Sequence, residues 1–141
     1  MIRVEVTRSG LDVKAFADTF IARIVKPLLE EAAGFAEREM KERAPRRTGA
    51  LVKSIRKTIR ERAAVIGPTV PYAIYVEYGT RPHEIRPVHA RALRFEVAGE
   101  VVFATRVWHP GTKPQPFVRE TAEETVKEIP SLFRKVWSRA V

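Results

Sequence analysis

The sequence predicts a single α+β domain, in which an antiparallel β-sheet is packed by a long helix in the N-terminal half and a second helix at the C-terminus. The length of 141 residues fits one domain (1–141), and 45% hydrophobic with 30% charged residues is typical of a folded globular chain. Apolar residues alternate with polar ones over 2–6, 55–60 and 93–97, whereas they recur at steps of three and four over 13–43 and 116–140. A helix with one apolar face must cover something, and a sheet of alternating strands supplies the opposing surface.

The N-terminal half is predicted to hold a strand followed by two helices. Residues 2–6 alternate as a half-buried strand does, with Ile2, Val4 and Val6 on one side. Asp12 can cap a helix that runs to about Val25 and whose apolar face is formed by Val13, Phe16, Phe20 and Ile24, with Ala17 beside it. Pro27 cannot donate to that helix but suits the first turn of a new one, so a second helix is predicted from Pro27 to about Arg43. Its buried face should be Leu28, Ala32, Phe35, Ala36 and Met40, and Ala44-Pro45 should end it.

Two hairpins and a short element should follow. Thr48 can cap a short turn over 49–54. Strands over 55–60 and 64–68 form one predicted hairpin, and strands over 93–97 and 101–107, joined at Ala98-Gly99-Glu100, form another. Residues 71–80 begin with Pro and end near Gly, which predicts a short helix, although these residues would also suit a strand.

The last element is predicted to be a helix from Pro116 to about Ala140 that kinks at Pro130. Its expected buried face is Val118, Ala122, Val126, Ile129, Phe133, Val136 or Trp137, and Ala140.

The composition argues against several function classes. The chain has no cysteine, which excludes disulfide scaffolds, thiolate zinc sites and cysteine nucleophiles, and indicates a chain made in a cytoplasm. No apolar run is long enough for a membrane span. The three histidines match no metal signature, and no nucleophile elbow, phosphate loop or paired acid and base is present, so we expect no enzyme activity, no cofactor and no metal. The absence of Asn and the many charges suit a thermophilic source, although a high-GC genome would also enrich Arg.

The positive charge is concentrated in one segment. The chain has a net charge of +9, and residues 38–62 hold ten cations against three anions. Such a basic block attracts phosphates or an acidic protein surface, and it can also be a plain solvated face. We expect Arg46, Arg47, Arg56 and Arg60 to face an acidic neighbour or to be neutralised within the fold.

Two segments have the composition of contact surfaces. Residues 72–83 combine three tyrosines with Glu77 and Arg81, and Tyr and Arg are enriched at interface hot spots. Residues 109–117 hold three prolines, which make a stiff loop, followed by Phe117. The candidate interface residues are Tyr75, Glu77, Tyr78, Arg81, Lys113 and Phe117. The alternatives are a core helix for the first segment and a loop that positions the last helix for the second.

Three motifs in order resemble a phage protein family. Residues 44–55 resemble the "AP-x-x-TGAL-x-x-SI" element of the HK97-type phage gene-product-ten family. Residues 72–81 are similar to its "YA-x-YVE-x-GT" element, and residues 114–119 to its "P-x-PF-hydrophobic-R" element. The order and the spacing fit over nearly the whole chain.

The resemblance implies a non-catalytic virion protein: a neck, tail-completion or minor tail subunit at the head–tail junction of a tailed phage or prophage. It implies assembly with copies of itself, with a hexameric ring suggested by tail symmetry, and contact with head-closure and tail-terminator or other tail proteins. DNA would pass nearby without specific binding. The alternative from the residues alone is a nucleic-acid-binding module that uses the Arg38–Arg62 block, although no aromatic residues alternate with those cations to stack on bases.

Overall fold

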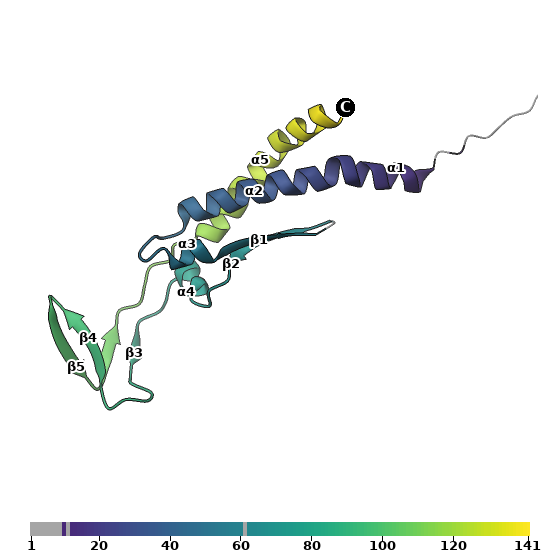
Figure 1. Cartoon of the computed structure of the whole chain (residues 1–141). Helices are drawn as coiled ribbons and strands as arrows, with labels where there is room; N and C mark the ends of the chain where they lie inside the picture. The colour runs from purple at the N-terminus through teal and green to yellow at the C-terminus, as the bar shows by residue number, and fades with distance from the viewer. Residues whose placement is uncertain (1–9, 11, 61) are drawn as a thin grey trace, which may run out of the picture.

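Long helices and three antiparallel strand pairs make up the structure, a computed structural model that describes residues 10, 12–60 and 62–141 (Figure 1). The elements are α1 (Val13–Phe20), η1 (Ile21–Val25), α2 (Lys26–Arg43), α3 (Ala50–Ser54), β1 (Ile55–Ile59), β2 (Ala64–Pro68), α4 (Ala73–Tyr78), β3 (His83–Ile85), β4 (Leu93–Val97), β5 (Glu100–Ala104), β6 (Val107–His109) and α5 (Phe117–Ala140). The predicted α+β class, with antiparallel sheets and the two long helices, is confirmed. The strand predicted over residues 2–6 lies outside the described residues.

The N-terminal helix does not break at Pro27, contrary to the prediction. Asp12 caps α1 as expected, because its carboxylate accepts the Ala15 N–H at 3.0 Å. Between α1 and α2 the helix widens into the π turn η1, in which the Lys26 N–H donates to the Ile21 carbonyl. A proline ring normally clashes with the carbonyl four residues earlier, and the wider turn relieves that clash, so the helix continues to Arg43 as one rod.

The strands form three separate two-stranded sheets in the described part of the chain, not the one sheet expected. The β1–β2 hairpin is present as predicted, except that β1 ends at Ile59 rather than at Arg60, and it packs against α2. The β4–β5 hairpin is also present, but its second strand ends at Ala104. Val107 belongs instead to β6, which pairs with β3, a strand that the sequence did not predict because it has only three residues.

The two long helices pack on each other, and α5 contacts α2 rather than a sheet. Small side chains at Ala33 and Ala36 allow the close approach, and both are buried. On α5 the buried residues are Phe117, Thr121, Leu132 and Val136. Val136 is buried as predicted, but along most of the helix the buried face lies about one position before the predicted one, and Val126, Ile129, Phe133 and Trp137 remain exposed.

The central core lies where α2 ends and α5 begins. Met40, Ala44, Leu51, Ile55, Ala73 and Phe117 form this buried cluster. The members of this cluster come from α2 and its end, α3, β1, α4 and α5. Each of the three segments that resemble the phage family contributes to it: Ala44, Leu51 and Ile55 from the first, Ala73 from the second and Phe117 from the third.

Below this core the chain extends as an arm, formed by β3–β6 and the β4–β5 hairpin, which stands apart from the helices (Figure 1).

Candidate assembly interface

A groove of about 730 Å³ lies between the helical body and the base of the arm. It is lined by the turn before α3 (Arg47, Thr48, Gly49), by Tyr72 and Tyr75 at α4, and by Lys113 and Gln115 of the proline loop. Segments that are far apart in the sequence thus share one surface. This volume is in the range of about 300–1,000 Å³ in which proteins hold a bound group.

Two Gly-Thr pairs cross at the floor of this region. Thr80 and Thr112 exchange two backbone hydrogen bonds, each 3.1 Å long, and their hydroxyls lie 3.1 Å apart. Gly79 and Gly111, just before them, have φ of 71° and 84°. A Cβ on Gly79 would collide with the Thr112 carbonyl, and one on Gly111 with the Thr80 carbonyl. Only glycine permits this crossing, which fixes the proline loop beside α4.

Two histidines close the arm side of the groove. His83 and His109 are paired across β3 and β6, and their rings stack with centroids 5.1 Å apart. His83 Nδ1 donates to the Arg81 carbonyl at 2.8 Å, whereas His109 Nδ1 accepts the Gly111 N–H at 3.0 Å. These bonds hold both rings against the base of the arm.

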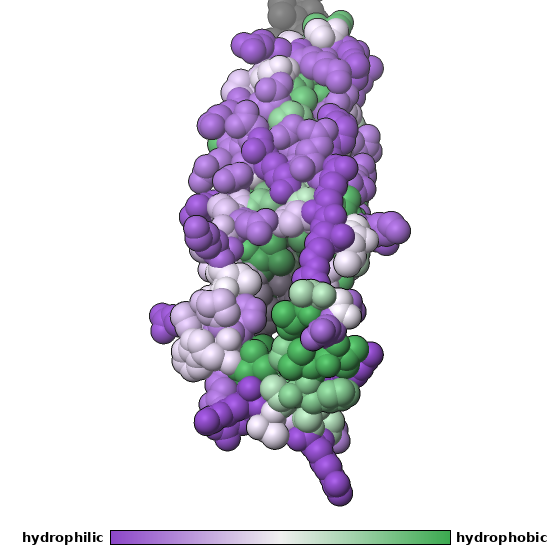
Figure 2. Space-filling model, turned by 90° about the vertical axis from the view of Figure 1, so that its left-hand side faces the viewer, coloured by the Kyte–Doolittle hydropathy of each residue, from purple (hydrophilic) through white to green (hydrophobic). Residues whose placement is uncertain are grey.

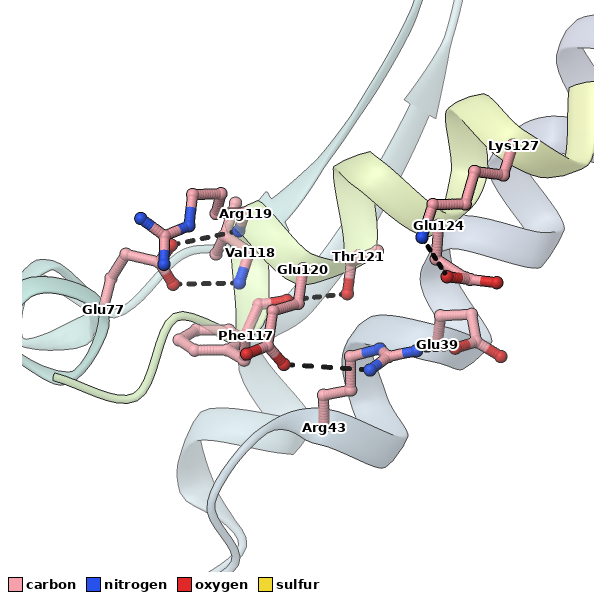
Figure 3. Close-up of polar contacts among 10 residues, drawn as sticks. All are labelled: Glu39, Arg43, Glu77, Phe117, Val118, Arg119, Glu120, Thr121, Glu124 and Lys127. Atoms are coloured by element: carbon pink, nitrogen blue, oxygen red, sulfur yellow. Dashed lines mark hydrogen bonds and ion pairs between the residues drawn. The ribbon is translucent and has the colours of Figure 1, made fainter.

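Glu77 is a buried cap of α5, not a contact residue at the surface (Figure 3). Its side chain is 7% exposed, and its two oxygens accept the Val118 and Arg119 N–H groups at 2.9 and 3.0 Å. Pro116, at the N-cap position of α5, supplies no side-chain acceptor. A carboxylate from α4 therefore satisfies the free amides and complements the positive end of the helix.

Phe117 is also inside the subunit. Its ring is 2% exposed in the central core, so it holds α5 to the other elements. Because Glu77 and Phe117 are buried, neither offers an exposed side chain for contact with another subunit. The sequence could not separate them from their neighbours, because burial depends on the fold around α4 and α5.

The other candidate residues are exposed on two sides of α4. Tyr75 (60% exposed) and Lys113 line the groove. Tyr78 (74% exposed) instead borders a smaller hollow with Pro114, Pro116 and Arg119. Arg81 is exposed and lines neither. The structure thus brings Tyr75 and Lys113 together and separates both from Tyr78.

The basic block lies beside the groove and along β1. Arg46, Arg47, Arg56 and Arg60 are exposed, and no ion pair between described residues involves them. Arg46 and Arg56 donate to backbone carbonyls, of Lys41 and of Lys53 and Ile55 respectively. Of these four arginines, only Arg47 lines the groove.

Other cations are paired along the helices and strengthen the fold. Glu37 accepts from Lys41 at 2.6 Å and lies 2.8 Å from Lys57, and these two partners lower its pKa to about 2. Lys135 and Arg139, both 2.9 Å from Glu31, likewise lower the pKa of that carboxyl, chiefly through the hydrogen bond from Lys135. The first set ties β1 to α2, and the second ties α5 to α2.

Sequence reasoning missed a third kind of surface, the exposed apolar residues. On α1, Val13 and Phe16 are exposed, and the Phe16 and Phe20 rings stack on each other. On α5 the unburied stripe includes Val126, which is 66% exposed, and the stacked pair Phe133 and Trp137. The helical spacing of these residues was visible in the sequence. The same spacing is expected whether the face packs inside the subunit or lies exposed, so spacing alone could not reveal an exposed surface.

Within the described ranges, no group of three His, Asp or Glu side chains could hold a metal ion. No helix there is long and apolar enough to cross a membrane.

Comparison with known proteins gives one match. The family model described as "Bacteriophage HK97-gp10, putative tail-component" matches residues 12–79. Neither the curated proteins nor the solved structures gave a significant match. The match supports the predicted resemblance and contains its first motif and most of the second. It ends at Gly79, so the last residues of the second motif, the arm and the motif over 114–119 lie outside it. Over residues 12–79 the chain is thus similar to the HK97-gp10-like family of bacteriophage proteins.

Proposed function

We propose that this chain is a non-catalytic neck or tail-completion subunit that assembles with copies of itself into a ring at the head–tail junction of a tailed phage or prophage particle. Six copies would match the symmetry of phage tails. Head-closure and tail-terminator or other tail proteins would be its neighbours. The family description, a bacteriophage tail component, supports the structural role, and the shape of the subunit supports assembly.

The observation that carries the proposal is the excess of exposed surface. The accessible surface is 11616 Å², whereas a compact monomer of 16.0 kDa exposes about 7,400 Å². Even if the residues outside the described ranges contributed as a fully extended chain, about 1,800 Å², an excess of roughly 2,400 Å² would remain. A standard interface covers about 800 Å² on each partner, so each subunit can form two.

Two different patches per subunit are what a ring requires. In a ring the contact is heterologous, because one patch of a subunit meets a different patch of the next. The groove side and the exposed apolar surfaces of the arm and helices are distinct regions of this chain. Residues of α2, α4 and α5 also pack together in the central core, which favours one domain per subunit.

The experiment is deletion of the gene from the phage or prophage, followed by electron microscopy of the particles. We expect separate full heads and tails, and restoration of joined, infectious particles when the gene is supplied in trans. Normal infectious particles without the gene would contradict the proposal.

A nucleic-acid-binding module is the second candidate, because the four arginines named above are exposed without ion pairs among the described residues. Binding of duplex DNA at ~0.15 M salt would favour the nucleic-acid-binding module if it weakens steeply as the salt concentration rises. The binding should also be lost when Arg56 and Arg60 are replaced by Glu. We expect weak binding, because strong adhesion would hinder DNA passing through the junction.

A further inference from the structure

The β4–β5 hairpin is incomplete as an isolated structure. Its strands pair only with each other, and no other described helix or strand makes more than marginal contact with them. A two-stranded ribbon alone is marginally stable in water and normally needs a third strand or a packed helix. This hairpin nevertheless exposes apolar residues on both faces, among them Val97, Val101 and Phe103, and Phe103 is 65% exposed. Figure 2 shows hydrophobic surface gathered over the lower part of the molecule, where the arm lies, below a mostly hydrophilic upper part.

The end of the hairpin is acidic in a basic chain. From Phe95 to Thr105 the sequence carries Glu96 and Glu100 and no Lys or Arg, although the whole chain has a net charge of +9. The turn itself is tight: Ala98 and Gly99 have φ of 52° and 87°, and Val97 pairs with Glu100. The tip is therefore a narrow wedge with one carboxylate on each face, Glu96 opposite Val101 and Glu100 opposite Val97.

The groove at the base of the arm has the complementary character. Its lining includes Arg47 and Lys113 and no Asp or Glu, and the exposed rings of Tyr72 and Tyr75 supply apolar surface. Arg46 lies next to Arg47 on the same exposed turn. The tip of the same subunit does not line its groove, and the hairpin stands clear of α3 and α4 (Figure 1).

We propose that the acidic tip of the β4–β5 arm docks in the groove of a second copy of this chain, with Glu96 and Glu100 facing Arg47 and Lys113. The inference rests on the proposed function and names the two surfaces of its ring contact. The arm tip of each subunit inserts and the groove at the base of the arm receives the tip of a neighbour, which is the heterologous geometry that a ring needs. The surface excess of roughly 2,400 Å² exceeds the ~1,600 Å² that one inserted and one receiving patch would cover.

The absence of cysteine allows a direct test by disulfide formation in trans. One variant carries Val97→Cys at the tip and another Ala50→Cys at the groove, and the two are mixed under mild oxidation. Docking would bring the two Cα atoms within the ~7 Å that a disulfide tolerates, so we expect a covalent dimer from the mixture. A control mixture of Val97→Cys with Ser131→Cys, on the exposed side of α5, should give none. Equal yields of covalent dimer in both mixtures, or no covalent dimer in either, would overturn the proposal.

A charge exchange tests the same contact without cross-linking. Glu96→Lys with Glu100→Lys, or Arg47→Glu with Lys113→Glu, should each weaken self-association roughly tenfold or more, because like charges then face each other. The chain with all four changes should recover self-association, because opposite charges then face each other again. Glu42→Lys with Glu123→Lys, both exposed elsewhere, is the matched control and should leave association unchanged.

Unchanged association in both reversed variants, or no recovery in the fourfold one, would overturn the arm-and-groove contact. So would a wild-type chain that never self-associates. In each case the proposed function would still be decided separately, by the particles formed after gene deletion.

Discussion

Removing the Glu77 carboxylate should destabilise the subunit far more than removing a surface carboxylate. In Glu77→Ala the Val118 and Arg119 N–H groups lose the acceptors that now lie 2.9 and 3.0 Å away. Each hydrogen bond to a charged group contributes about 1.5–3 kcal/mol, but both bonds are only partly buried, so water recovers part of the loss. We therefore expect a loss of about 3 kcal/mol in the free energy of unfolding.

The amide variant separates the two bonds. Glu77→Gln keeps one acceptor oxygen but turns its NH₂ toward the second backbone N–H, so about half of the loss, ~1.5 kcal/mol, is expected. The control is Glu124→Gln, because among the described residues Glu124 pairs only with Lys127, on the surface of α5, and such pairs contribute about 0.2–1 kcal/mol.

Urea unfolding at pH 7, followed by far-ultraviolet circular dichroism, measures all three variants at one low protein concentration. The expected order of destabilisation is Glu77→Ala, then Glu77→Gln, then Glu124→Gln. If Glu77→Ala stayed within about 0.5 kcal/mol of the natural chain, a range typical of surface substitutions, the capping argument would be refuted.

Four further outcomes are expected. Gly79→Ala should cost more than 1 kcal/mol in urea unfolding, because the new Cβ collides with the Thr112 carbonyl and φ of 71° disfavours alanine. Phe117→Ala should lower stability by about 3–5 kcal/mol, since the ring is fully buried, and should therefore reduce assembly indirectly. Tyr78→Ala should leave the melting curve unchanged but reduce incorporation into particles, which would place this exposed ring at a contact. Glu37, whose pKa falls from about 4.5 to about 2 on folding, stabilises the fold above pH 4.5 and loses that contribution as the pH drops toward 2. Between pH 5 and pH 2 the natural chain should thus lose about 1 kcal/mol more than Glu37→Gln does, by acid titration followed with circular dichroism.

Local patterns were sufficient to predict most elements of the fold. The Asp12 cap, the end of α2 at Arg43 and both strands of the first hairpin follow from propensity and alternation over a few residues. The break at Pro27 was not predictable in the same way, because a π turn can absorb the proline ring without ending the helix.

The buried face of α5 could not be predicted from apolar spacing. The helix buries Thr121, whose hydroxyl donates to the Phe117 carbonyl at 2.7 Å, and leaves Val126 in solvent. A threonine that satisfies its own hydroxyl within the helix can occupy a core position, and an apolar stripe can be reserved for a partner. Spacing identifies the amphipathic helix but not which face the subunit itself covers.

The candidate site was partly predictable. The sequence motifs singled out Tyr75 and Lys113, and both line the groove. That the loop and α4 meet depends on the crossing of Gly79 and Gly111, a contact between residues about thirty positions apart that no local pattern encodes. The role of Glu77 likewise required the position of α5, since its partners are 41 and 42 residues away.

Quantitative mass spectrometry of purified infectious particles tests the central claim most directly. If the chain is a ring subunit at the head–tail junction, it should be present in every particle at a fixed small copy number, six if the ring follows tail symmetry, and antibody labelling should place it where head meets tail. Its absence from purified particles, or a copy number that varies with the preparation, would contradict the account.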